Sequence, residues 1–89
     1  MDYMDLLWEK IRSFEGEIFH TVSGIPFSYE ILGNDLLRNG SEYPLNRSNF
    51  KKALELQPKN VAAISRKVRG PSYVYAILTD PRIHALSKE

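Results

Sequence analysis

The first stretch of the chain has the apolar spacing of one helical face. Five apolar residues recur at the i, i+3, i+4, i+7 spacing of an amphipathic helix: Met4, Leu7, Trp8, Ile11 and Phe14. Asp2 and Asp5 suit the positive end of such a helix, and Gly16 can end it in the left-handed conformation. We therefore predict an N-terminal helix whose aromatic face belongs to the core.

The next segment, residues 17–32, changes to a period of two. A reversal centred on Gly24 and Ile25 aligns three pairs on one face: Val22 with Phe27, His20 with Tyr29, and Ile18 with Ile31. The opposite face pairs Phe19 with Glu30 and Thr21 with Ser28. Because Pro26 has no N–H to close a two-residue turn, we expect a four-residue loop over residues 23–26 in the same register. The pattern predicts a β-hairpin with His20 inside and Phe19 on a partly exposed face.

A third strand is predicted directly after this hairpin. The tripeptide Gly33-Asn34-Asp35 marks a second reversal, and Leu36-Leu37-Arg38 is a short strand that ends at Asn39-Gly40. The three strands together form an antiparallel meander that we expect to pack on the first helix.

Helical signals return in the second half. Ser48 can cap a helix that ends at Pro58 and faces the core with four residues: Phe50, Ala53, Leu54 and Gln57. Asn60 can cap a second, short helix with three inward residues: Val61, Ile64 and Val68.

Residues 71–79 are the last predicted element. Their composition would suit a strand, but Val74, Ile77 and Leu78 match helical spacing. Pro71 fits the first helical turn, and Asp80-Pro81 provides a stop. We predict a helix here. The fold class is α+β: an N-terminal helix, a three-stranded antiparallel meander, then two or three short helices packed on one face.

Composition narrows the class of protein. A chain of 89 residues with 43% hydrophobic and 26% charged residues is predicted to form a single small domain over residues 1–89. The absence of cysteine excludes disulfides, thiolate nucleophiles and cysteine-based zinc sites. The apolar runs are short and the first residues are acidic, so we expect a cytoplasmic, unprocessed protein with no membrane partner.

Charge is distributed unevenly along the chain. Residues 1–45 have a net charge of −5, whereas residues 46–89 have a net charge of +6. This asymmetry indicates a polyanionic or acidic partner for the second half. The alternative is that the two halves attract each other within the fold.

The densest basic stretch comes just before the last predicted helix. Arg66, Lys67 and Arg69 precede Pro71, so the free N–H groups of Ser72, Tyr73 and Val74 would point out of the positive helix end beside three cations. Such an arrangement favours binding of phosphate or carboxylate. Tyr73 or Tyr75 could stack on a base or donate to a phosphate oxygen. The predicted nucleic-acid-binding residues are Arg66, Lys67, Arg69, Ser72 and Tyr73, extended by Arg47, Lys51 and Lys52.

Known catalytic and metal-binding motifs are absent from the sequence. There is no G-x-S-x-G frame, no glycine-rich phosphate loop and no second ligand at helical spacing from His20 or His84. We expect no enzyme activity, no cofactor and no metal. The predicted function is a non-enzymatic module that binds nucleic acid through phosphate contacts. One alternative is a protein-interaction module, in which the hairpin face with Phe19 and Thr21, or the acidic first helix, meets a partner or a second copy. Another is a small regulatory subunit that acts on an enzyme. An acidic protein is the alternative to nucleic acid as the partner of the basic second half.

Overall fold

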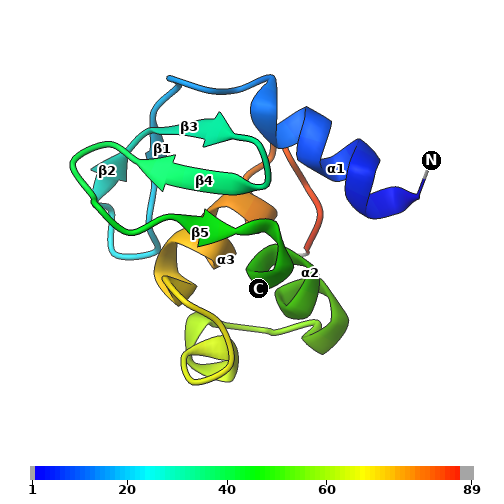
Figure 1. Cartoon of the computed structure of the whole chain (residues 1–89). Helices are drawn as coiled ribbons and strands as arrows, with labels where there is room; N and C mark the ends of the chain where they lie inside the picture. Colours follow the sequence, from blue (N-terminus) through cyan, green and yellow to red (C-terminus); the bar gives the residue numbers. More distant parts are fainter. Residues whose placement is uncertain (1, 87–89) are drawn as a thin grey trace.

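The computed structural model describes residues 2–86 and has the predicted α+β fold. Helix α1 (Tyr3–Arg12) comes first, followed by five short strands (Figure 1). The strands are β1 (Phe19–His20), β2 (Pro26–Phe27), β3 (Tyr29–Leu32), β4 (Asp35–Arg38) and β5 (Leu45–Asn46). Helix α2 (Arg47–Leu56), the 3₁₀ helix η1 (Val61–Ile64) and helix α3 (Pro71–Thr79) complete the described chain.

Helix α1 forms as the apolar spacing predicts. The Asp2 carboxylate accepts a hydrogen bond from the Asp5 N–H at 2.9 Å and caps the first turn. Trp8 is buried, and its indole Nε1 donates to the Gly33 carbonyl at 2.9 Å, which ties the helix to the β3–β4 turn. The predicted end at Gly16 is wrong, because the helix stops at Arg12 and Gly16 lies beyond its C-cap.

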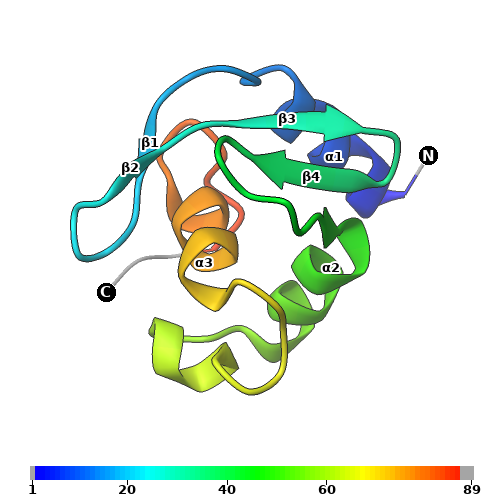
Figure 2. The ribbon, with the colours of Figure 1, turned by 60° about the vertical axis from the view of Figure 1, so that its left-hand side comes forward.

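The three-stranded antiparallel meander consists of β3, β4 and β5 instead of the two predicted hairpin strands and the strand at residues 36–38, because β1 and β2 form a separate hairpin (Figure 2). Strand β4 corresponds to the strand predicted at residues 36–38. Strand β5 was not predicted, because its two residues, Leu45 and Asn46, are too few to show a period of two. Leu45 pairs with Leu36 and is buried.

The predicted hairpin register is wrong. Phe19 pairs with Phe27 and His20 with Pro26, so Phe19 is fully buried and His20 is exposed. Tyr29 instead pairs with Arg38 on β4. The expected pairing differs from the observed one by an odd number of positions, and such a slip exchanges the two faces of a strand.

Thr21 explains where the hairpin turns. Its N–H donates to the Ile25 carbonyl at 3.0 Å, and its hydroxyl accepts from the Ile25 N–H at 3.0 Å. Its carbonyl also accepts from the Gly24 N–H at 2.9 Å. These bonds close the reversal between residues 21 and 25, one residue before the proline that cannot donate. The expected loop over residues 23–26 is therefore replaced by this tighter turn.

The helices of the second half follow the predicted order. The cap of α2 is Asn46 rather than Ser48, since the Asn46 side chain accepts from the Ser48 N–H at 3.0 Å. Gln57 is exposed and left-handed, with φ 45°, instead of facing the core. Asn60 caps η1 as predicted, and α3 is a helix beginning at Pro71.

The core lies between the sheet and the helices. Helix α3 runs beneath the meander, with α2 beside it and η1 on its far side (Figure 2). Residues 74–79 of α3 are all buried. Trp8 of α1 meets Phe50 of α2 edge-on, with ring centroids 5.4 Å apart. No helix within residues 2–86 is long and apolar enough to cross a membrane.

Candidate nucleic-acid interface

Three of the predicted cations lie on one connection, residues 65–70, which we call the basic loop. Arg66, Lys67 and Arg69 are all exposed there. Val68, between the last two, is buried, and its N–H donates to the Ile64 carbonyl at 3.2 Å. The buried valine anchors the loop, so the cations on either side of it project into solvent.

The basic loop is held in place by α2 and β5. The Arg69 N–H donates to the Asn49 side-chain oxygen at 3.1 Å. Gly70 has φ 55°, and a Cβ built on it would lie 3.0 Å from the nearer methyl carbon of Leu45. Glycine is therefore required here both by the left-handed backbone and by the closeness of Leu45.

The three cations of α2 are placed differently from one another. Arg47 forms an ion pair with Asp5 at 2.7 Å, and its guanidinium lies 5.8 Å from the Trp8 ring centroid. Lys51 lines the same side of α2 as Arg47, next to α1. Lys52 is exposed and one turn from Asn49, so it lies on the side of α2 that holds the basic loop. Helical spacing thus places Lys52 on the side of α2 nearest the basic loop, while Arg47 and Lys51 lie on the side of α1.

The start of α3 offers fewer free donors than predicted. The N–H groups of Tyr73 and Val74 both donate to the Gly70 carbonyl at 3.0 Å. This leaves the N–H of Ser72 as the one of the three predicted donors that has no acceptor within residues 2–86. The expected row of backbone donors is therefore wrong for Tyr73 and Val74.

The ring of Tyr73 is already covered. The Arg38 guanidinium carbon lies 3.8 Å from its ring centroid, and the Phe27 ring meets it at 5.0 Å and 87°. Tyr75, the other tyrosine of α3, is buried and donates from its hydroxyl to the Lys59 carbonyl at 3.0 Å. Tyr75 therefore has no ring face exposed for a base, and the half-buried Tyr73 already holds the Arg38 guanidinium over its ring.

An exposed aromatic residue that the sequence reasoning missed lies on the loop between β4 and β5. Tyr43 is 71% exposed. The signal available in the sequence was an aromatic residue within a polar loop, where no core position explains it.

The features proposed for a protein interaction are also rearranged. Phe19 and Thr21 are buried, so the predicted exposed hairpin face does not exist. The outer edge of β3 is covered, because the Gly16 N–H donates to the Tyr29 carbonyl at 3.0 Å and the Ile31 N–H donates to the Glu15 carboxylate at 2.6 Å.

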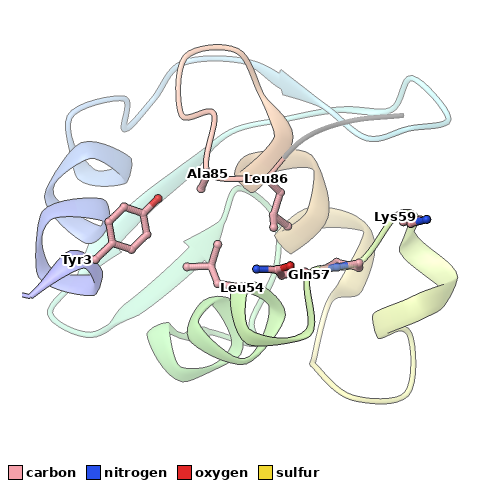
Figure 3. Close-up of a pocket in the computed structure, with 7 residues that line it drawn as sticks. Tyr3, Leu54, Gln57, Lys59, Ala85 and Leu86 are labelled. Carbon is pink, nitrogen blue, oxygen red and sulfur yellow. The ribbon is translucent and has the colours of Figure 1, made fainter.

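A surface pocket lies between α1, the end of α2 and the last described residues (Figure 3). Tyr3 reaches from α1 toward Leu54, Ala85 and Leu86, and Lys59 lies at the other end. His20 and His84 are exposed, and residues 2–86 contain no cluster of three His, Cys, Asp or Glu side chains that could hold a metal ion.

Comparison of the chain with protein-family models, with curated proteins and with solved structures found no match.

Proposed function

We propose that this protein is a non-enzymatic nucleic-acid-binding module that contacts phosphates through the basic loop. Arg66, Lys67 and Arg69 carry most of the contact, and Lys52 extends it. The observation that carries the proposal is the absence of neutralising partners: within residues 2–86 none of these four cations forms an ion pair. We also propose that the protein is cytoplasmic, because its nucleic-acid ligand would be found inside the cell.

The distribution of acidic residues supports this proposal. Residues 56–79 contain Lys59 and the three loop cations but no aspartate or glutamate. The two ion pairs seen in residues 2–86 occupy Arg47 with Asp5 and Arg82 with Asp80. The ion pair that joins the two halves within residues 2–86 is that of Arg47 with Asp5, and the basic loop is available for an external anion.

Rigid attachment of the loop adds to the argument. Both of its ends are fixed, by the Ile64 carbonyl at one and by Asn49 and Leu45 at the other. Cations held in place lose less conformational entropy when they meet phosphates than cations on a flexible segment do.

The proposal is tested by fluorescence anisotropy with labelled single-stranded and duplex oligonucleotides. Log affinity should fall linearly with log salt, with a slope of about −2 to −4 for three to five neutralised phosphates. The variant Arg66→Gln with Arg69→Gln should reduce the steepness by about 1.5 to 2 without lowering thermal stability.

The matched control is Lys10→Gln with Arg12→Gln. These two cations are exposed on α1, away from the basic loop, and the control removes the same charge (Figure 1). Its salt dependence should remain that of the wild type. Equal weakening by both double variants would assign the effect to net charge, and the absence of salt-dependent binding to any nucleic acid would overturn the proposal.

A second candidate function is a protein contact through the tip of the β1–β2 hairpin. Val22 is 61% exposed and Ile25 is 54% exposed, and both lie on the turn that extends from the body of the molecule (Figure 2). Light scattering of the wild type and of Val22→Ser with Ile25→Ser tests this candidate for self-association. A concentration-dependent dimer lost in the variant would support it.

A further inference from the structure

Tyr43 lies on a loop whose conformation is fixed. We call residues 39–44 the tyrosine loop. The Tyr43 N–H donates to the Ser41 hydroxyl at 3.2 Å, and the same hydroxyl accepts from the Arg38 guanidinium at 3.3 Å. Pro44 follows directly and restricts the backbone of Tyr43 to extended conformations. The ring is thus held at the surface by an ordered loop, with 71% of the residue exposed.

The tyrosine loop and the basic loop meet at their ends. Leu45, which follows the tyrosine loop, is the residue that leaves no space for a Cβ on Gly70, the last residue of the basic loop. Asn49 links the basic loop to the end of β5, because its amide nitrogen donates to the Asn46 carbonyl at 3.2 Å and its oxygen accepts the Arg69 N–H at 3.1 Å. Figure 2 shows both loops on the side of the molecule where α3 begins.

Arg38 extends this link to the start of α3. Its guanidinium stacks on Tyr73 and also donates to Ser41. Arg38 therefore lies over Tyr73. Through Ser41, it also helps to position the exposed Tyr43. An aromatic ring and three cations that form no ion pair within residues 2–86 therefore lie on adjoining loops.

We propose that Tyr43 is a base-stacking residue and that the ligand of the basic loop is a single-stranded nucleic acid. This inference rests on the proposed function. Proteins that bind single strands combine cations that follow the phosphates with aromatic rings on which bases stack. A duplex offers its phosphates to the basic loop but keeps its base faces inside the helix, so it cannot use the Tyr43 ring.

The test compares a fluorescein-labelled oligothymidylate of about 12 nucleotides with a duplex of the same length. Tyr43→Ala should weaken binding of the single strand by about 5- to 150-fold, the range expected for loss of one base–aromatic stack. The salt slope should stay unchanged, because the phosphate contacts remain. Tyr43→Phe should bind as the wild type does, since stacking needs the ring and not the hydroxyl. Tyr3→Ala removes another exposed tyrosine, 61% exposed on α1, and should have no effect.

The outcomes separate this inference from the proposed function. Salt-dependent binding in which the duplex is preferred, or in which Tyr43→Ala has no effect, would overturn the single-strand inference and leave the phosphate contacts standing. Loss of binding in Tyr43→Ala together with a lower melting temperature would make Tyr43 structural and also overturn it. Failure of every oligonucleotide to bind would overturn the proposed function itself.

Discussion

The guanidinium carbon of Arg82 lies 3.8 Å from the centroid of the Phe19 ring. The same side chain pairs with Asp80 at 2.9 Å and donates from Nη2 to the Ile18 carbonyl at 2.9 Å. Arg82 therefore covers the buried face of β1 and holds the backbone that precedes it. The position of the first strand therefore depends on Arg82, which lies 64 positions after Ile18 in the chain.

We predict that Arg82→Ala lowers the free energy of unfolding by on the order of 1–3 kcal/mol. The substitution removes the cation–π contact and the hydrogen bond to Ile18, and it leaves the partly buried Asp80 without this cation. Arg82→Lys should recover only part of the loss, because an ammonium cannot reproduce the planar, bidentate contact. Urea unfolding followed by the fluorescence of Trp8 measures the difference.

Arg12→Ala is the matched control for Arg82, because Arg12 is exposed at the end of α1. Its effect should stay within about 0.5 kcal/mol. Equal values for Arg12→Ala and Arg82→Ala would contradict the role assigned to Arg82.

The ion pair between Arg47 and Asp5 predicts a dependence of stability on pH. The hydrogen bond from the Arg47 guanidinium holds the pKa of Asp5 below its ordinary value of 3.8. A carboxyl group with a lowered pKa stabilises the fold above its unfolded pKa, and this contribution is lost as the pH falls through the folded pKa. The pair should therefore stabilise the protein at pH 7 and cease to do so in acid.

A double-mutant cycle isolates this pair from the contact of Arg47 with Trp8. The variants are Arg47→Gln, Asp5→Asn and the combination, each melted at pH 7 and at about pH 3 or below. The coupling between the two positions should be present at pH 7 and should shrink in acid. A coupling that is the same at both pH values would show that the charge of Asp5 is not involved.

The accuracy of the sequence predictions depends on how far apart the deciding residues are. The spacing around Trp8, the Asn60 cap and Pro71 are local signals, and each marks a helix that is present, although η1 ends at Ile64 and does not extend to the predicted inward residue Val68. The hairpin register depends on the Thr21 hydroxyl, whose bond to the Ile25 N–H alternation does not reveal, and on Arg82, which reaches the Ile18 carbonyl from 64 positions away. Side-chain contacts that the alternating pattern does not report therefore decide the register.

The candidate interface shows the same division. The exposure of Arg66 and Lys67 follows from the buried Val68 nearby in sequence, so spacing could suggest it. The choice between Tyr73 and Tyr43 as the available ring could not be made from spacing. Arg38 covers Tyr73 from β4, 35 positions earlier, and no local pattern reports that contact.

The contact between Gly70 and Leu45 gives the last prediction. Gly70 and Gly40 both have left-handed backbones, with φ 55° and 83°. A Cβ on Gly40 would meet nothing within 4 Å, whereas a Cβ on Gly70 would lie 3.0 and 3.1 Å from the two methyl carbons of Leu45. Leu45 is only 3% exposed, so it has little room to move aside.

Gly40→Ala should destabilise the protein by about 1–2 kcal/mol, the cost of a left-handed L-residue. Gly70→Ala should cost at least about 1 kcal/mol more, because it adds an overpacked contact to the same backbone strain. Chemical denaturation of the two variants measures the difference. Identical unfolding midpoints would mean that Leu45 yields to the added methyl group, and the requirement for glycine at position 70 would then come from the backbone conformation alone.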